Sequence, residues 1–288
     1  MKRDEFRRFH RLRVRWAEVD MQKIVFNAHY LMYFETAMAE YWRALALPYE
    51  EAMRQLEGDL FVRKAAVEFQ ASARVDDQLD IGLRCVRIGT SSMQFVGAIF
   101  RAEQLLVTGE LVYVFADPAS QASRPVPQAL REILLGHEAG EPMLRVRTGA
   151  WDELGRDASA IRTRVFVEEQ KIPADLEWDE ADATAVHAVA YNRLGQAVAT
   201  GRLLQAEPGV AKVGRMAVHQ VLRGSGVGQQ VLQALAKAAH ARGERRLVLH
   251  AQRTAEGFYR RLGLQAEGQP FEEAGIPHIT MSAQLPLG

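Results

Sequence analysis

The spacing of apolar positions divides the first part of this chain into a strand, a helix and a set of strands. Residues 11–18 alternate apolar and basic side chains, with Leu12, Val14 and Trp16 on one face, which is typical of a half-buried strand. From 28 to 45 the apolar residues recur at helical spacing. Four strand-like runs follow, at 60–70, 78–88, 92–102 and 105–116. One long helix followed by an antiparallel meander predicts an α+β unit whose sheet wraps around the helix.

The second part of the chain mixes strand and helix patterns. A strand is expected at 144–148, a helix at 151–166, and a hairpin at 186–192 and 197–205 that turns around Gly195. The later elements are a strand at 211–218, a helix at 226–242, a strand at 246–251, a helix at 255–262 and a strand near 278–283. This order predicts a mixed α/β unit, so the expected fold class is α+β with two domains.

Residues 117–142 separate these two patterns because they are rich in residues that interrupt helices and strands. Prolines and small polar residues fill 117–127, and a short helix is expected at 128–135 before Gly136. We therefore expect a first domain at 1–118, a linker with a short helix at 119–142 and a second domain at 143–288.

Length, composition and charge narrow the class of protein. The 288 residues fit two compact domains, and a hydrophobic share of 48% gives both of them a core. Thirty-six basic residues balance thirty-six acidic ones, which argues against a nucleic-acid partner. No signal-like segment and no run of 18 apolar residues occur, so we expect a cytoplasmic protein without membrane insertion. Cys85, the single cysteine, excludes an internal disulfide and a Cys-rich metal site, and we expect it in the core and no metal in the protein.

A glycine-rich stretch joins a predicted strand to a predicted helix and carries the clearest chemical signal. It reads Arg-Gly-Ser-Gly-Val-Gly at 223–228. Glycines let the backbone approach a ligand closely, and a helix N-terminus favours an anion by roughly 0.3–1 kcal/mol. The spacing fits neither the dinucleotide fingerprint nor a Walker loop. The stretch therefore predicts a cradle for a diphosphate.

The same stretch resembles the acyl-CoA loop of GNAT N-acetyltransferases, written Arg/Gln-x-x-Gly-x-Gly/Ala. Met-Ala-Val at 216–218 and Phe-Tyr-Arg-Arg-Leu-Gly-Leu at 258–264 stand where this family has its fourth strand and a later helix end, and the resemblance, closest to the ElaA-type branch, covers 143–286. It implies the GNAT fold, acetyl-CoA as co-substrate, an amine acceptor and Tyr259 as general acid for the leaving thiolate. The residues it places around coenzyme A are Val218, Arg223, Gly224, Ser225, Gly226, Val227 and Gly228.

Proton transfer sets requirements on both sides of such a reaction. A phenol with a pKa of about 10 stays protonated at neutral pH, although Tyr259 could instead cap a core with its hydroxyl in water. A lysine-like amine is neutral in about one part in 1,000 at pH 7, a cost of roughly 4.6 kcal/mol, so a base is needed. The sequence does not choose among the candidate bases, which are Glu168, Glu169, His187 and His278.

The segment 16–35 resembles the opening of hotdog-fold acyl-CoA thioesterases of the hydroxybenzoyl-CoA or YbgC type. These enzymes have an Asp after the first strand and then Asn/His-x-x-Tyr-x-x-Tyr-Phe-Glu in the central helix; here the Asp is Asp20, and the helix pattern runs from 27 to 35. The resemblance implies that Asp20 attacks a thioester or activates water, with helix N–H groups polarising the carbonyl. A turn carboxylate without catalytic role is the alternative. Lys23 stands where the family usually has Gly, and Asn27 stands where many members have His.

Together these features predict a bifunctional enzyme that hydrolyses acyl-CoA in its first half and transfers acetyl groups to an amine in its second. The hotdog resemblance also implies a homodimer whose active sites lie across the interface, with Tyr30 and Glu35 in structural or interfacial roles. Two alternatives stay open: the hotdog half is a non-catalytic dimerising or acyl-CoA-sensing module, or the second half is a non-catalytic GNAT-like fold. The acyl chain and the acceptor are not predicted.

Overall fold

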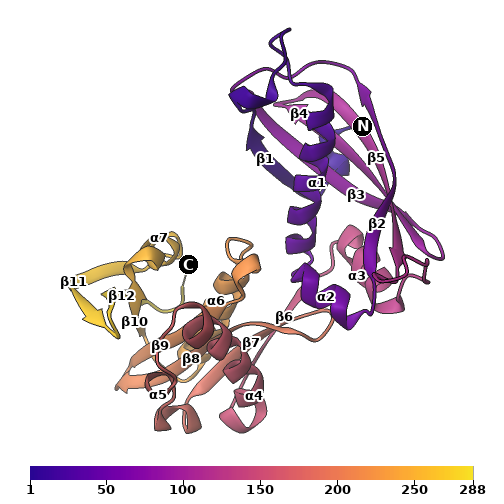
Figure 1. Ribbon diagram of the computed structural model, residues 1–288. Helices are drawn as coiled ribbons and strands as arrows, with labels where there is room; N and C mark the ends of the chain where they lie inside the picture. Colours follow the sequence, from indigo (N-terminus) through magenta and orange to yellow (C-terminus); the bar gives the residue numbers. More distant parts are fainter. Residues whose placement is uncertain (288) are drawn as a thin grey trace. The chain divides into compact units, whose positions relative to one another are not determined.

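A computed structural model describes residues 1–287, which form two compact units that divide between Met143 and Leu144 (Figure 1). The predicted two-domain α+β class is confirmed: the first unit combines an antiparallel sheet with a long helix, and the second is a mixed sheet covered by helices. None of the described helices is both long enough and apolar enough to span a bilayer.

The first unit is a five-stranded antiparallel sheet in the order β1-β3-β4-β5-β2. The short helices η1 and η2 span Arg3–Glu5 and Trp16–Glu18. The strands are β1 (Phe9–Arg13), β2 (Asp59–Phe69), β3 (Gln78–Ile88), β4 (Ser92–Arg101) and β5 (Gln104–Ala116), and the α-helices are α1 (Asn27–Ala44), α2 (Tyr49–Gln55) and α3 (Gln128–Ala139). The expected strand at 11–18 is wrong in its second part, because the chain leaves β1 at Arg13 and coils into η2.

The long helix α1 packs on the sheet through one fully buried aromatic ring. Phe34 is 0% exposed, and Gly97 on β4 and Gly109 on β5 lie directly beneath it. A Cβ atom at Gly97 would come within 2.5 Å of the ring, and one at Gly109 within 2.6 Å. Burying such a side chain contributes roughly 1.5–3 kcal/mol, so the two glycines matter because they let the helix approach the sheet.

Helix α3 belongs to the first unit, although its residues fall in the segment expected to be a linker. Arg131 donates to the carbonyl oxygens of Ile88 and Gly89 at 3.0 and 2.7 Å. Glu138 Oε1 accepts from the Tyr41 hydroxyl at 2.6 Å and from the Cys85 backbone N–H at 2.9 Å. The breaker-rich residues are therefore a connection within this unit, which extends to Met143 rather than ending at 118, because the apolar side of α3 is buried.

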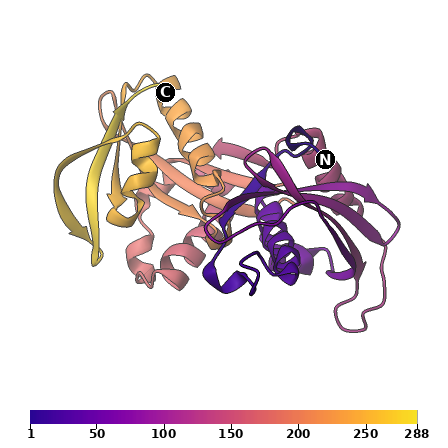
Figure 2. The ribbon, with the colours of Figure 1, turned by 90° about the horizontal axis from the view of Figure 1, so that it is seen from above.

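The second unit is a seven-stranded sheet in the order β11-β12-β10-β9-β8-β7-β6, and its β11–β12 hairpin forms one edge (Figure 2). Only β9 and β10 run parallel among the described pairs. Its strands are β6 (Leu144–Gly149), β7 (Val186–Asn192), β8 (Ala197–Glu207), β9 (Val210–Val218), β10 (Arg246–Gln252), β11 (Gln265–Glu273) and β12 (Ile276–Gln284). The helical elements are α4 (Trp151–Arg162), the π-helical η3 (Thr163–Glu169), α5 (Ala174–Glu177), η4 (Glu180–Ala183), η5 (Gln220–Leu222), α6 (Val227–Ala241), η6 (Arg253–Ala255) and α7 (Glu256–Arg261).

Two features of this unit differ from expectation. Strand β11 was not predicted, because an edge strand with mostly polar, exposed residues carries no apolar alternation. The helix expected at 151–166 is regular only to Arg162 and continues as a π-helix to Glu169, a form that is often found at functional sites.

Strands β9 and β10 separate partway along their length. They pair from Val210 with Arg246 to Val213 with Leu249, and both strands then continue without pairing to each other. Beyond this point Arg215 adopts a left-handed conformation with φ of 50°, and the β8–β9 register is irregular opposite it. A non-glycine residue in this region is a feature of bulges and strained functional sites, and here it accompanies the opening between the two strands.

Candidate active sites

The glycine-rich loop lies between β9 and α6, as the sequence predicts. Gly224 and Gly226 have φ values of 82° and 89°, which side chains rarely tolerate, so glycine is required at both positions. Helix α6 begins at Val227, and the first N–H groups of a helix have no partner inside it. The Ser225 N–H instead bonds to the Leu222 carbonyl at 3.3 Å, and its hydroxyl bonds to the same oxygen at 2.6 Å. Ser225 thus holds the turn, and the amides that follow it fit an anion.

The third glycine, Gly228, brings α6 close to its neighbours. A Cβ atom there would lie 3.2 Å from the Val218 side chain and 3.4 Å from the Phe258 ring. Phe258 in turn packs edge-on against Tyr259, with 4.9 Å between ring centroids. The loop, the end of β9 and α7 are therefore packed together at this glycine.

Arg223 is tied to protein groups on both sides of the loop. Its guanidinium donates two bonds of 2.6 Å to the carboxylate of Glu169 and one of 3.2 Å to the Val218 carbonyl. The hydrogen bonds from Arg223 lower the pKa of Glu169 below its ordinary value. A carboxylate held in this way is a weak base, which argues against Glu169 as the base for an amine.

Tyr259 on α7 is buried, with 7% of its surface exposed, and it lines the pocket at the β9–β10 opening. Burial raises the pKa of Tyr259 to about 12. The phenol therefore stays protonated at neutral pH, as a proton or hydrogen-bond donor to sulfur requires.

The pocket has a volume of about 530 Å³ and is walled by the separated strands, η3, α5, α7 and the β11–β12 hairpin. Of the four bases considered from the sequence, His278 lines it, whereas Glu168, Glu169 and His187 do not.

Two ionisable residues in the wall of this pocket, His250 and Glu273, were not predicted as site residues. His250 sits in an ordinary strand pattern, and Glu273 belongs to the unpredicted β11, so no spacing along the chain joins them.

His187 is a structural residue. It is 1% exposed, packs on the Trp151 ring at 4.8 Å, and its Nε2 lies 2.9 Å from the Asp182 carbonyl oxygen. Burial lowers the pKa of His187, so the ring is neutral at physiological pH.

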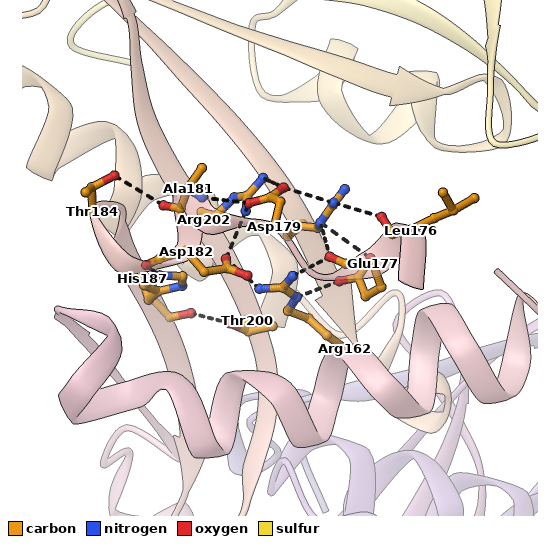
Figure 3. A network of polar contacts seen from close by, with 12 residues as sticks. Arg162, Leu176, Glu177, Asp179, Ala181, Asp182, Thr184, His187, Thr200 and Arg202 are labelled. Carbon is orange, nitrogen blue, oxygen red and sulfur yellow. Dashed lines mark hydrogen bonds and ion pairs between the residues drawn. The ribbon is translucent and has the colours of Figure 1, made fainter. Parts of the chain in front are cut away.

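One wall of the pocket is fixed by a network of three arginines and three carboxylates (Figure 3). Arg162 on α4, 1% exposed, contacts Glu177 at 2.5 Å and Asp182 at 2.8 Å. Arg202 on β8 bridges Asp182 at 2.9 Å and Asp179 at 2.5 Å. Burial would raise the pKa of Asp182, but the two arginines outweigh it and lower the pKa.

The third arginine of this network is Arg215, the strained residue of β9. Its guanidinium lies 3.4 Å from the Glu177 carboxylate and 3.3 Å from that of Asp179. The network thereby connects the β9 bulge to the acidic segment 177–182 and keeps the wall close to charge balance. The three carboxylates lie close together in the sequence, whereas the three arginines come from separate elements.

Asp20 of the first unit lies in a tight turn just before α1. Its N–H bonds to the Ile24 carbonyl at 2.9 Å, its carbonyl accepts from Lys23 at 2.9 Å, and its carboxylate accepts from the Gln22 N–H at 2.8 Å. Lys23 has a φ of 62°, which is the left-handed region that glycine adopts most easily. The backbone thus explains why the resemblance places Gly at this position.

A buried polar group holds this turn in place. Glu18, 3% exposed, accepts hydrogen bonds from the Arg15 N–H and Nε at 2.7 Å and from the Tyr33 hydroxyl at 2.7 Å. Burial would raise the pKa of Glu18, but these bonds lower it below the ordinary value. Sequence reasoning missed Glu18 because it was assigned to an alternating strand.

The polar residues of α1 have structural partners. The Tyr30 hydroxyl accepts from the Ala73 N–H at 2.9 Å, and Glu35 accepts from the Tyr113 hydroxyl at 2.8 Å. Cys85 is buried, and burial raises its pKa to about 12, so its thiol is inert. Among residues 1–287, no group of three or more His, Cys, Asp and Glu side chains is arranged to hold a metal ion.

Comparison with known proteins assigns both units to families. Residues 156–285 match the acetyltransferase (GNAT) domain, and residues 14–134 match the thioesterase-like superfamily. The chain therefore belongs to the GNAT family through its second unit, and its first unit matches the thioesterase-like superfamily, so both resemblances are confirmed. Members of these families use CoA thioesters.

Similar proteins match one unit at a time. The uncharacterized N-acetyltransferase YjcF of Bacillus subtilis is 37% identical over 131 residues, which are 45% of this chain and 92% of that protein. Escherichia coli ElaA, known from a crystal structure, is 28% identical with a TM-score of 0.44 and covers 49% of this chain and 99% of its own. A thioesterase from Thermus thermophilus, crystallised with coenzyme A and Zn, is 24% identical with a TM-score of 0.42 and covers 48% of this chain and 98% of its own.

Proposed function

We propose that this protein is a bifunctional enzyme of CoA thioesters: its GNAT unit transfers an acetyl group from acetyl-CoA to an amine, and its thioesterase-like unit hydrolyses acyl-CoA. The observation that carries the proposal is the pocket at the β9–β10 opening: Tyr259 lines it, and the neighbouring Phe258 packs against Gly228 at the start of α6. A protein with this activity is expected in the cytoplasm.

In the GNAT unit, the amides at the start of α6 and Gly224 and Gly226 fit a diphosphate, because the backbone there is open and the helix end is positive. Arg223 would exchange Glu169 for the diphosphate. Val218 marks the end of β9, where the pantetheine arm would run toward the pocket. Tyr259 then donates a proton or a hydrogen bond to the sulfur that leaves the thioester.

In the thioesterase-like unit, Asp20 is the proposed catalytic carboxylate. It precedes the N-terminus of α1, whose first N–H groups are available to polarise a thioester carbonyl. Both roles, nucleophile and general base for water, fit the position of this carboxylate in its turn.

A non-catalytic role for this unit is the second candidate, and two observations favour it. The carboxylate of Asp20 already accepts a hydrogen bond from its own turn, and Lys23 occupies a backbone position that suits glycine. In this case the unit binds acyl-CoA or dimerises without turnover.

A homodimer through the first unit is also part of the proposal. Strand β2 is an edge strand of 11 residues, and Val62 and Phe69 on it are 52% and 53% exposed. Around the Asp20 turn, Trp16 and Met21 are 82% and 101% exposed. Long edges and exposed apolar groups are normally covered, and a second copy of the chain supplies both a strand partner and an apolar surface.

The test follows free thiol from a panel of acyl-CoA esters with and without amines. Release without an amine reports hydrolysis, and release that needs an amine reports acetyl transfer. Tyr259→Phe should lower only the amine-dependent release, by about 100-fold for a lost general acid. Sedimentation of the wild type checks the dimer. Thiol release from neither reaction, together with no binding of acetyl-CoA by calorimetry, would contradict the proposal.

A further inference from the structure

The wall of the GNAT pocket contains a paired histidine and glutamate, His250 and Glu273, which have no role in the function proposed above. His250 is the first residue of β10 beyond its last pair with β9. Its Nδ1 lies 3.0 Å from Glu273 Oε2, and both side chains line the pocket together with Tyr259. The Phe271 ring packs edge-on against the imidazole at 4.9 Å and fixes its plane.

We propose that His250 is the catalytic base that takes the proton from the acceptor amine, and that Glu273 is the positioning residue that holds the imidazole in the required tautomer. The inference rests on the proposed acetyltransferase function and names its missing base. A carboxylate that accepts from Nδ1–H leaves Nε2 with its lone pair, and it stabilises the imidazolium that forms.

Charged and titratable groups from three further elements line the pocket around this pair. They are His278 from β12, Lys212 from β9 and Tyr259 from α7. Burial would raise the pKa of Glu273, but His250, His278 and Lys212 together lower it, so the carboxylate is ionised at neutral pH.

His278 is the competing base, and its surroundings suit the role less well. Its Nδ1 lies 2.7 Å from the Ile276 carbonyl oxygen, which carries no full charge to stabilise an imidazolium. The ring stacks on Phe271 and the residue is 9% exposed. The His250 side chain is 34% exposed, so it can receive a proton inside the pocket and release it to water.

The step balances without a further reactant. His250 Nε2 takes one proton from the acceptor ammonium. The freed lone pair forms the C–N bond at the thioester carbonyl carbon while the C–S bond breaks. The sulfur receives a proton from Tyr259, which regains one from the nitrogen, and His250 releases its proton to solvent. One amide, one thiol and one proton leave in each turnover.

The kinetic test compares benzylamine and aniline as acceptors at pH 7, because the first is a protonated amine and the second is already neutral. His250→Gln should lower kcat/KM for benzylamine about 100-fold, as for a lost general base, and should change the rate with aniline only a few-fold. Calorimetry should give an unchanged Kd for acetyl-CoA. His240→Gln, at the end of α6, is the matched control and should leave both rates unchanged.

Further variants separate the positioning role from the catalytic one. Glu273→Gln should lower the benzylamine rate about tenfold, which is a typical loss when a carboxylate that orients a histidine is removed. It should also shift the acidic limb of the pH profile for benzylamine. Equal losses for the two acceptors in His250→Gln would overturn the proposal. A larger loss in His278→Gln than in His250→Gln would also overturn it.

A spectroscopic measurement does not depend on turnover. Nitrogen NMR of the wild type above neutral pH should show His250 with its proton on Nδ1, and Glu273→Gln should weaken that preference. A neutral ring protonated on Nε2 overturns the proposal. This outcome is distinct from failure of the proposed function, which would be a wild type that neither binds acetyl-CoA nor acetylates an amine.

Discussion

The two candidate sites are supported in different ways. In the second unit, one wall of the pocket is held by buried ion pairs in which Arg162 is only 1% exposed. In the first unit, the Asp20 turn is held by its own backbone bonds and by Glu18, and Trp16 beside it is 82% exposed. The GNAT pocket is thus built within one unit, whereas the Asp20 turn lies beside exposed apolar side chains that the proposed homodimer would cover.

This difference predicts which changes each site tolerates. Removing one charge from a buried network leaves the others unpaired, so the GNAT pocket should be sensitive to single substitutions far from the reacting atoms. The Asp20 site should respond to its carboxylate and to dimerisation rather than to distant charges.

The largest effect is expected from Arg162→Met. The substitution removes the buried guanidinium that Glu177 and Asp182 share, leaves them with Arg215 at 3.4 Å and Arg202 at 2.9 Å, and should destabilise the second unit by about 3–5 kcal/mol in urea unfolding. Arg246→Met, which removes a half-exposed pair with Glu267, is the matched control and should cost at most about 1 kcal/mol. Equal losses in the two variants would show that burial of the network does not support the pocket wall.

Asp20→Ala should produce the next largest change. Loss of a nucleophile or general base should reduce acceptor-independent release of thiol at least about 100-fold, while amine-dependent acetylation stays unchanged. Glu103→Ala, a substitution of an exposed carboxylate in the β4–β5 turn, should alter neither reaction. If Asp20→Ala still hydrolyses acyl-CoA at the wild-type rate, the first unit is a binding module.

The sequence predicted most of the fold because apolar spacing reports local structure. The strands 78–88 and 186–192 match β3 and β7 in both bounds. The polar edge strand β11 was missed, and the packing of the predicted linker helix, α3, on the first unit was not predicted, because burial on a partner element cannot be read from local spacing.

The candidate sites show the same limit. The glycine loop and Tyr259 could be proposed from the sequence because their positions are fixed relative to neighbouring elements in the chain. The pair of His250 and Glu273, the arginines of the pocket wall and buried Glu18 were missed, because tertiary packing brings each of them to its partner.

A smaller effect is expected at the Arg223–Glu169 ion pair. In this pair Glu169 binds the guanidinium that is proposed to hold the diphosphate. Glu169→Gln removes this competitor, and an exposed pair is worth roughly 0.2–1 kcal/mol, so acetyl-CoA should bind up to about fivefold more tightly. Glu168→Gln is the neighbouring control and should leave the Kd unchanged by calorimetry. Weaker binding in Glu169→Gln would mean that the pair orients Arg223 rather than blocking it.

The same pair gives a dependence on pH. Because Arg223 lowers the pKa of Glu169, the ion pair is intact above the ordinary range of glutamate and is lost as the pH falls through the lowered value. The gain from Glu169→Gln should therefore be complete at neutral pH and should shrink in acid, where the wild-type carboxylate becomes neutral as well. A gain that is independent of pH would show that the charge of Glu169 is not its cause.

The smallest effect is expected from Lys23→Gly in the Asp20 turn. The left-handed backbone at Lys23 destabilises the folded state of the wild type by about 1–2 kcal/mol, and glycine removes this strain. Glycine also makes the unfolded chain more flexible, which offsets about 0.5–1 kcal/mol of the gain. The first unit should therefore gain up to about 1 kcal/mol in thermal or urea unfolding. Glu68→Gly, at an exposed position of β2 with ordinary strand geometry, should instead lose about 0.5–1 kcal/mol. If Lys23→Gly also raises hydrolysis, the lysine restrains catalysis; if stability rises and hydrolysis does not, the strained turn affects folding alone.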